Sequence, residues 1–264
     1  MIVGISMMKD EADVVDHTVR RMAAQVDHLL VADNGSTDGT RDILADLTAE
    51  VPLVVVDDDR VAYYQSEKMS GLAALALSMW GEGWIVPFDA DEVWSADRPI
   101  RDLLAAAPTE QMTVGAAVFD HVATPDTLAS LPIPSTPWRR PTPAELPKVA
   151  CRTHPKLVIA QGNHYAIYDG WHEWPATRPI TIHHFPYRSV DQFCRKVHNG
   201  LAAYEATDLP PAEGAHWRQY GQTLNDHGRA GIEALFKKWF WRNDPRSEVV
   251  IEGERQPALV WDAA

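Results

Sequence analysis

Residues 84–92 read WIVPFDADE, a short apolar run that ends in three acids within four residues. The apolar part has the length and composition of a buried strand. Ligands of open α/β sheets bind beyond the carboxyl ends of the strands, and carboxylates this close repel one another unless a cation lies among them. Oxygen ligands on a short turn suit Mg²⁺ or Mn²⁺, which also bind a diphosphate, so we predict a metal site here. The alternative interpretation is a solvated acidic turn that caps the next helix.

Upstream of this segment, short apolar runs alternate with helical patterns. We expect strands at residues 2–7, 28–32, 53–56 and 84–88, and helices at residues 12–24, 40–49 and 67–80. Such βα repeats predict an α/β protein with a Rossmann-like, mixed but mainly parallel sheet flanked by helices.

Downstream of residue 107 the alternation stops. Strands are expected at residues 113–119, 156–160, 180–184 and 247–252, and helices at residues 189–206 and 230–242. The proline-rich segment 125–147 predicts a long irregular loop, and loops of this length are usually functional or disordered. We therefore expect a main domain over residues 1–188 and a mainly helical C-terminal extension, residues 189–264, that packs on it.

Composition narrows the classes of function. The 264 residues carry a net charge of −13, which disfavours general electrostatic binding to nucleic acid. Cys151 and Cys194 are the only cysteines, so no disulfide framework is expected. Because there is neither a signal-peptide pattern nor a run of eighteen apolar residues, we expect a cytoplasmic protein. The basic and aromatic stretch 235–242 leaves peripheral contact with the inner face of the membrane as an alternative to packing on the main domain.

A second motif follows the second expected strand. Residues 31–40 read VADNGSTDGT, in which the strand delivers Asp33 to the sheet edge and Gly35 permits a tight turn. Ser36 or Thr37 can then cap the next helix. Asp33 is placed to accept hydrogen bonds from a base or a ribose, although the motif is also a good turn-and-cap sequence without any ligand.

A third motif follows the strand expected at residues 180–184. Residues 183–189 read HHFPYRS, and a neutral imidazole at a strand end can complete the coordination of a metal. Arg188 can face a phosphate. Histidines that are structural or simply exposed are the alternative interpretation.

Taken together, these motifs resemble the family 2 glycosyltransferases, which have the GT-A fold. The resemblance is carried by Met8–Glu11 (MKDE), Asp33–Asp38 (DNGSTD), Asp89–Glu92 (DADE, the family's D-x-D) and His184 with Arg188, Ser189 and Lys196. It is dense over residues 1–95 and returns over residues 155–200.

The resemblance implies an inverting transfer of a sugar from a nucleotide-diphosphate donor, with a UDP-sugar favoured and Mn²⁺ or Mg²⁺ on the diphosphate. Residues 1–188 would then be the nucleotide-sugar-binding and catalytic domain. The roles that it implies are contacts to the nucleoside from Asp33 and Glu11, to the diphosphate from Lys68, to the ribose or metal from Asp89, and to the metal from Asp91 and His184.

The chain departs from the family pattern at the general base. Many members carry an E-D pair whose Asp accepts the proton of the acceptor, and this chain has no E-D pair. Inversion still requires a base opposite the leaving group. His164, Glu173 and Asp120 are the candidates by position, and we favour His164 and then Glu173. Because the base is unassigned, a non-catalytic nucleotide-sugar or glycan-binding protein of the same fold stays as the alternative function.

Other functions fit the sequence less well. A sugar-phosphate nucleotidyltransferase needs a glycine-rich N-terminal loop, and an aspartyl phosphatase needs its D-x-D after the first strand. For the acceptor we expect a glycan, a lipid-linked sugar or a small molecule rather than nucleic acid, because of the negative charge. Trp171, Trp174 or Trp138 could stack on it.

Overall fold

The computed structural model describes residues 1–121, 139–140 and 142–239, and these form two compact units. The first unit holds residues 1–60, 64–118 and 144–184. The second holds residues 61–63 with the described parts of 119–143 and of the chain from 185 onward. The expected domain boundary at residue 188, and the packing of the C-terminal extension on the main domain, stay predictions.

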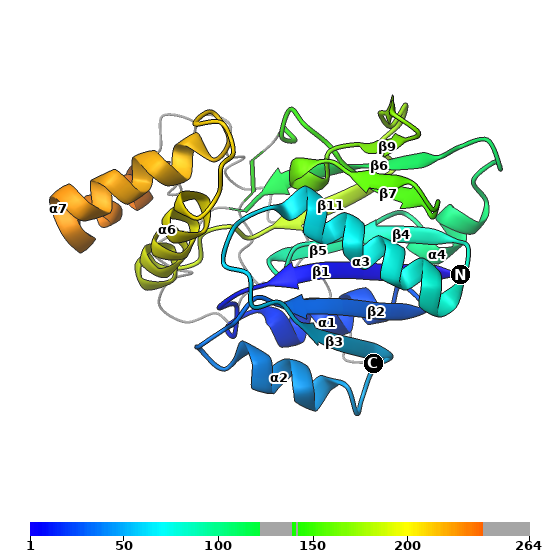
Figure 1. Cartoon of the computed structure of the whole chain (residues 1–264), viewed down its shortest axis with the longest axis horizontal. Helices are drawn as coiled ribbons and strands as arrows, with labels where there is room; N and C mark the ends of the chain where they lie inside the picture. Colours follow the sequence, from blue (N-terminus) through cyan, green and yellow to red (C-terminus); the bar gives the residue numbers. More distant parts are fainter. Residues whose placement is uncertain (122–138, 141, 240–264) are drawn as a thin grey trace. The chain divides into compact units, whose positions relative to one another are not determined.

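An eight-stranded sheet forms the centre of the first unit (Figure 1). Its order is β3-β2-β1-β4-β7-β6-β11-β5. β1, β2, β3 and β4 pair in parallel, whereas β7 pairs antiparallel with β4 and with β6, and β11 pairs antiparallel with β5. The strands are β1 (Ile2–Met8), β2 (His28–Asp33), β3 (Leu53–Asp57), β4 (Trp84–Pro87), β5 (Glu92–Ser95), β6 (Thr113–Asp120), β7 (Lys148–Arg152) and β11 (Ile180–His184).

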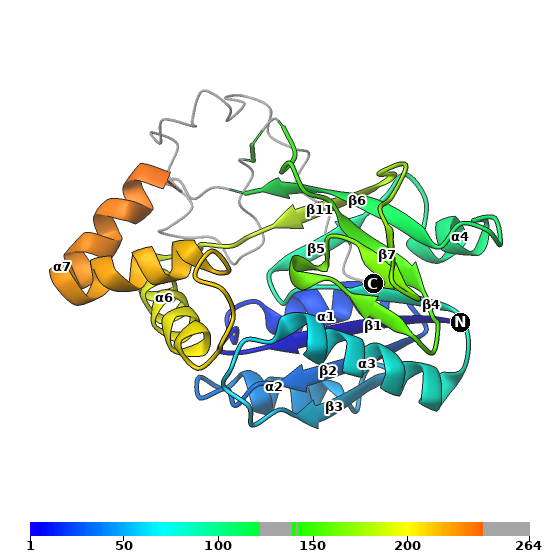
Figure 2. The same cartoon turned by 45° about the horizontal axis from the view of Figure 1, so that its top comes forward.

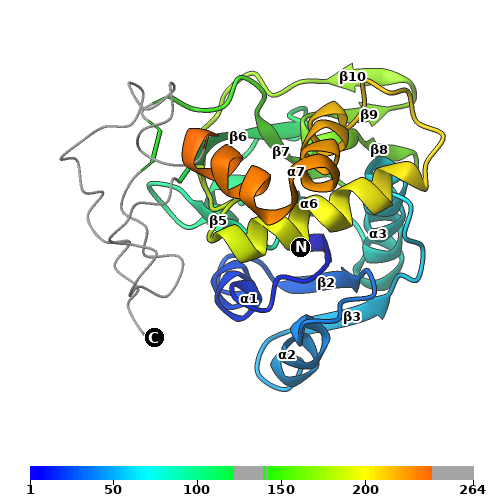
Figure 3. The same ribbon diagram turned by 90° about the vertical axis from the view of Figure 1, so that its left-hand side faces the viewer.

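Helices cover both faces of the parallel strands, because successive side chains of each strand point to opposite faces. Leu29 and Val31 of β2 belong to one buried cluster with residues of the helices α1 (Val15–Ala23), α2 (Thr40–Leu47) and α4 (Ile100–Ala105). Leu30 of the same strand packs on the other face with α3 (Gln65–Trp80). Figure 3 shows α1 and α3 on opposite sides of β2. The predicted βα pattern is thereby confirmed.

A small antiparallel sheet, in the order β10-β9-β8, also contributes to the core on the α3 face. It consists of β8 (Leu157–Ile159), β9 (Ala166–Tyr168) and β10 (Trp171–Glu173). A short 3-10 helix, η1 (Gln161–Asn163), joins β8 to β9. Gln65 and Ser66 at the start of α3 hydrogen-bond to this helix, which fixes the position of the residues that follow it.

The second unit contains α6 (Val190–Glu205) and α7 (Ala215–Trp239), which pack against each other (Figure 2). Phe193 and Val197 of α6 are buried with Ile232 and Phe236 of α7. Ser189 caps α6, since its hydroxyl accepts the backbone N–H of Gln192 at 3.1 Å. No helix in the described part of the chain has both the length and the apolar character needed to cross a membrane.

The structure differs from the sequence-based expectation in several places, which include the unexpected helix α4. Glu92 begins strand β5, where the alternative interpretation expected a helix. β7 lies in a stretch for which no strand was expected, and α7 begins at Ala215 rather than at residue 230. β9 and β10 were also not expected. The strand expected at residues 247–252 and most of the expected loop 125–147 lie outside the described residues.

Candidate active site

The carboxyl ends of β1, β2, β3 and β4 meet at one edge of the sheet, because these strands are parallel. β1 lies between β2 and β4, so the loops that follow β1 and β4 leave the sheet on either side of a change in strand order. Such a switch point is where open α/β sheets bind their ligands. The MKDE, DNGSTD and DADE motifs all lie at this edge.

Asp33 is the last residue of β2, in register with Met8 of β1 and Asp57 of β3. Its side chain is buried, and the backbone N–H of Ser36 donates to its Oδ2 at 3.2 Å. Its Oδ1 accepts no hydrogen bond from any residue that the structure describes. A buried carboxylate oxygen without a donor costs free energy, so Oδ1 is suited to accept an N–H or O–H from a ligand.

The loops after β1 and β2 are joined by hydrogen bonds. The ammonium of Lys9 donates to the carbonyls of Asn34 and Gly35, both at 2.8 Å. Asp10 donates its N–H to the hydroxyl of Ser36 at 3.0 Å. Glu11 is buried, and its N–H donates to the hydroxyl of Thr40 at 2.8 Å. The MKDE and DNGSTD motifs therefore form one structure, in which Glu11 and Asp33 are both buried.

Asn34 links the loop after β2 to the loop after β3. Its side-chain N–H groups donate to the carbonyls of Asp58 and Arg60 and to the carboxylate of Asp58, each at 2.9 Å. That carboxylate also forms an ion pair with Lys68 at 2.6 Å. Lys68, which we expected at the diphosphate, is thus held against the loop after β3. Asn34 and Asp58 were not singled out from the sequence, although Asn34 lies inside a motif that was.

The acidic motif forms a closed turn at the end of β4. The N–H of Glu92 donates to the carbonyl of Asp89, and the Oε2 of Glu92 accepts the N–H of Asp89, both at 3.1 Å. The same Oε2 accepts the indole N–H of Trp94 at 3.2 Å. Asp91 and Glu92 are buried, at 3% and 1% exposure. A solvated acidic turn that caps a helix, the alternative interpretation, is therefore wrong.

An internal cation faces this turn. Lys148, the first residue of β7, forms ion pairs with Asp89 and with the Oε1 of Glu92, the latter at 2.5 Å. Antiparallel pairing puts the start of β7 beside the end of β4, which explains the contact. Burial alone would lower the pKa of Lys148, but the charges of Asp89 and Glu92 outweigh it and raise the pKa above its ordinary value. Burial raises the pKa of Glu92, against the opposing charge of Lys148.

From the sequence we expect three acids to tolerate one another because a divalent ion lies among them. In the structure Lys148 already supplies a positive charge to two of them. Lys148 was missed because it lies 59 residues from Asp89 in the chain and carried no motif of its own. An apolar run directly after it, Val149–Cys151, is the signal that could have indicated a strand starting at the lysine.

Asp91 and His184 are the two predicted metal ligands, and the structure brings them together. The Nε2 of His184 lies 3.6 Å from the Oδ1 of Asp91. The pairing of β11 with β5, which places His184 opposite Glu92, causes this approach. In the described residues no three His, Cys, Asp or Glu side chains form a group that could hold a metal ion. Two donors fit an ion that also takes phosphate oxygens, whereas they do not fit a site closed by protein alone.

His164, the favoured candidate base, follows η1. Its Nδ1 lies 2.7 Å from the carbonyl of Pro147, the residue before Lys148. Because a carbonyl can only accept, Nδ1 carries the proton and Nε2 is left as the basic nitrogen. Burial lowers the pKa of His164; the hydrogen bond to Pro147 opposes this, and the charge of Lys148 adds to it. Gly162 has φ +73° and a side chain there would overlap the imidazole, so the glycine leaves room for His164.

The other two candidate bases lie elsewhere in the fold. Glu173 is half-buried in β10, opposite Ala166 at the edge of the small sheet. Asp120 belongs to the second unit, where its carbonyl accepts the N–H of Arg140 at 2.9 Å. Neither observation tests a catalytic role for these residues.

The remaining motif residues belong to the second unit. Arg188, expected to face a phosphate, is buried and donates to the carbonyl of Phe185 at 3.0 Å. Its own N–H donates to the side chain of Gln192 at 3.1 Å. Together with the cap formed by Ser189, these contacts give the R-S pair a structural part in starting α6.

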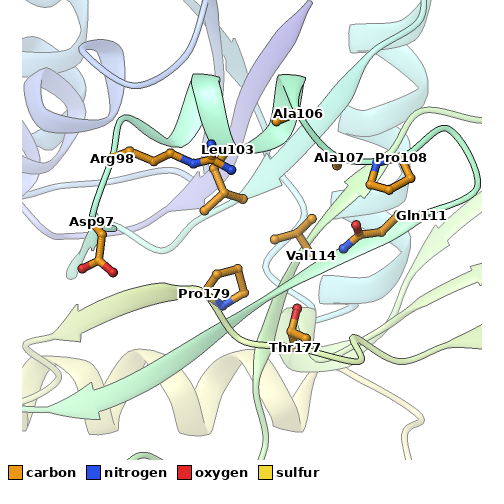
Figure 4. A pocket seen from close by; sticks show the side chains of 10 residues that line it. All are labelled: Asp97, Arg98, Leu103, Ala106, Ala107, Pro108, Gln111, Val114, Thr177 and Pro179. Atoms are coloured by element: carbon orange, nitrogen blue, oxygen red, sulfur yellow. The ribbon is translucent and has the colours of Figure 1, made fainter.

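A pocket opens at the opposite end of β5 and β11 from Asp91 and His184 (Figure 4). Asp97 and Arg98 follow β5 there, and Thr177 and Pro179 precede β11. Since His184 pairs with Glu92 and Thr181 pairs with Ser95, the strands themselves separate this pocket from the acidic turn. None of the predicted site residues lines it.

Parallel strands with helices on both faces and a switch point between β1 and β4 form the arrangement in which open α/β proteins bind their ligands. Residues 5–158 match the sequence profile of glycosyl transferase family 2, which is more than half of the chain, and the chain belongs to this family. The mixed, mainly parallel sheet flanked by helices and the C-terminal helices confirm the predicted GT-A fold class.

Several solved structures are similar to this chain at low identity. TarS from S. aureus is 12% identical with a TM-score of 0.39, and the match covers 87% of this chain but only 44% of TarS. The TarS 1-349 structure in complex with UDP is 13% identical, with 88% and 74% covered and a TM-score of 0.39. The mannosyltransferase PcManGT from Pyrobaculum calidifontis, in complex with GDP-Man and Mn2+, is 17% identical, with 88% and 73% covered and a TM-score of 0.40. The comparison with curated proteins gave no match.

Proposed function

We propose that this chain is an inverting glycosyltransferase that uses a nucleotide-diphosphate sugar, with a UDP-sugar favoured, and Mn²⁺ or Mg²⁺ on the diphosphate. Membership of family 2 supports the reaction class. The acceptor is a glycan, a lipid-linked sugar or a small molecule, in keeping with the net charge of −13, which repels nucleic acid.

One observation carries the proposal: the buried Oδ1 of Asp33 has no donor among the described residues, at the carboxyl edge of the parallel strands, where open α/β sheets bind ligands. The imide N–H of uracil is a donor that fits such an acceptor. The oxygen accepts a hydrogen bond on binding, which removes the cost of leaving it unpaired. Glu11, buried in the adjoining loop, is proposed as a second contact to the nucleoside.

The diphosphate lies toward the acidic turn in this proposal. Asp91 and His184 would hold the divalent ion, and the ion would neutralise charge on the departing nucleoside diphosphate. Asp89 lies nearest the ribose. Lys68 contributes positive charge beside the loop after β3, and its pairing with Asp58 fixes where that charge stands.

His164 acts as the general base. Its Nδ1–H is committed to the carbonyl of Pro147, so Nε2 is free of that bond and can take the proton of the acceptor hydroxyl. A lowered pKa keeps the imidazole neutral, which is the form that accepts a proton. Glu173 is the second candidate for this role.

Thermal-shift titration with UDP, GDP and CDP, each with and without Mn²⁺, tests the donor site. A ligand that binds only the native state raises its stability, so we expect the largest shift with UDP and Mn²⁺ together. Asp33→Asn should remove most of the shift. Asp46→Asn, which changes an exposed acid of α2, is the matched control and should leave it intact.

Turnover separates an enzyme from a binding protein of the same fold. We expect Mn²⁺-dependent hydrolysis of UDP-sugars, slow without the acceptor, and its loss in Asp91→Asn. Binding of UDP without turnover of any nucleotide sugar would instead support the non-catalytic alternative, and an absence of nucleotide binding would contradict both.

A further inference from the structure

We propose that Lys148 is a positioning residue that decides which acid of the DADE turn ligates the metal. This inference rests on the proposed function and assigns a role to a lysine outside the motifs. It holds that Lys148 keeps Asp89 and Glu92 as its own counter-ions, so that Asp91, with His184, is the only acid of the turn that serves the divalent ion.

The contacts of Glu92 show that its carboxylate is fully used. Its Oε1 lies 2.5 Å from the ammonium of Lys148. Its Oε2 accepts the N–H of Asp89 at 3.1 Å and the indole N–H of Trp94 at 3.2 Å. At 1% exposure the side chain cannot turn outward without breaking all three interactions. Glu92 therefore stabilises the turn and is not available as a ligand.

Asp89 differs because its side chain is 32% exposed. Of the three groups that contact the side chain of Glu92, only Lys148 has a side chain that binds the carboxylate of Asp89. Without the lysine, this carboxylate would be the nearest competitor of Asp91 for a divalent ion. The ammonium attracts Asp89 and repels a cation, and both effects are strong because the lysine side chain is only 9% exposed. The lysine thus separates two acids that the sequence presents as equivalent.

Strand pairing fixes the positions of the two residues that contact the acids, Lys148 and His184. Lys148 is on β7, which is held by antiparallel pairing to both β4 and β6. Asp91 lies beside a different residue, His184 of β11. The antiparallel pairing of β11 with β5 holds His184 in place. Asp89 and Glu92 therefore share a partner on β7, whereas the partner of Asp91 lies on β11.

Binding of Mn²⁺ in the presence of saturating UDP, measured by electron paramagnetic resonance of the free ion, tests the proposal without any turnover, because the two protein donors fit an ion that also takes phosphate oxygens. In Lys148→Met, Asp89 becomes available and one positive charge is removed, so we expect Mn²⁺ to bind about tenfold more tightly than to wild type. Lys148→Arg keeps the charge and should restore wild-type affinity. Turnover should fall in Lys148→Met while affinity rises, because the ion moves toward Asp89. A folded Lys148→Met variant with wild-type Mn²⁺ affinity overturns the proposal.

A double variant makes the reassignment visible. Asp91→Asn should abolish Mn²⁺ binding in wild type but not in the Lys148→Met background, where Asp89 replaces it. Loss of binding in both backgrounds overturns the proposal. If wild type and Lys148→Met bind Mn²⁺ equally well, the proposal fails while the metal dependence of the proposed function stands. If wild type binds no Mn²⁺, the metal dependence of the proposed function fails and the role of Lys148 fails with it, so the two failures are distinguishable.

Should Lys148→Met not fold, single substitutions of the acids still test the role of the lysine. Asp89→Asn leaves Lys148 paired with Glu92, and we expect it to weaken Mn²⁺ binding by about tenfold at most, whereas Asp91→Asn weakens it by about a hundredfold or more. Equal losses in the two variants would show that both acids ligate the ion, which contradicts the proposal.

Discussion

The acids at the ends of β2 and β4 differ in whether the protein supplies partners for their carboxylate oxygens. At the end of β2, the carboxylate of Asp33 keeps one buried oxygen without a donor among the described residues. At the end of β4, the carboxylates of Asp89 and Glu92 are both matched by Lys148. At β2 a hydrogen-bond acceptor is left for a ligand, whereas at β4 a lysine of the protein neutralises the acids. The acidic cluster in the sequence is therefore a weaker indication of a ligand than the single buried oxygen of Asp33 that lacks a donor.

The largest expected effect is on the acid that Lys148 does not neutralise. We expect Asp91→Asn to lower Mn²⁺-dependent transfer by about a thousandfold, because charge on the departing diphosphate loses its stabilisation. Steady-state rates at saturating donor measure this. The control is Asp46→Asn, and a loss below about threefold would show that the metal side of the comparison is misassigned.

His164 should give the next largest effect. As a general base it contributes about a hundredfold, so His164→Gln should lower kcat by that amount with little change in donor affinity. Burial lowers the pKa of His164, so the neutral, active form persists below the ordinary histidine pKa of about 6.5.

The pH profile checks the sign of this assignment. The acid limb of log(kcat/KM) should lie below pH 6.5 in the wild type and vanish in His164→Gln. If the limb persists in His164→Gln and disappears in Glu173→Gln instead, the base is Glu173.

The nucleoside side of the comparison is tested through affinity. Asp33→Asn keeps the shape but removes the charge, and we expect UDP to bind about thirtyfold more weakly, equivalent to about 2 kcal/mol for a hydrogen bond to a charged acceptor. Isothermal titration with UDP in Mn²⁺ gives the number. An unchanged dissociation constant would mean that the unpartnered oxygen faces no ligand.

The smallest expected effect concerns the rigidity of that side. Asn34→Ala removes the bonds from the Asn34 side chain to Asp58 and Arg60, and we expect a loss of about 1–2 kcal/mol in the free energy of unfolding. For a chain of this size the Tm should fall by a few degrees, about 2–4 °C per kcal/mol. Differential scanning calorimetry measures it, and Lys68 should also become more mobile because Asp58 loses a partner.

The sequence predicted the parallel half of the fold because local signals suffice there. Each of β1, β2, β3 and β4 is a short apolar run before a turn, and the helices between them keep their period. The antiparallel half was harder, since β7, β9 and β10 are short and their pairing partners are distant in the chain. α7 was expected to begin later because residues 215–229 are polar and bury little.

The candidate site shows the same division. Asp33, Asp89 and Asp91 follow strands directly and could be predicted to lie at one edge, which the structure confirms. The place of the histidines at a strand end suggested that an imidazole could complete the coordination of the metal, and the family resemblance then singled out His184. Lys148 could not be predicted, because its contact with Asp89 depends on an antiparallel register that no local pattern encodes. The roles of all these residues in binding and catalysis stay predictions.

The anchoring of Lys148 on β7 has a consequence for how this protein can diversify. Residues 121–147, the longest stretch between two consecutive sheet strands that pair with each other, end immediately before the lysine. Because the ladders of β7 with β4 and β6 set the position of the ammonium, insertions or deletions in that stretch need not disturb the charge balance of the acidic turn.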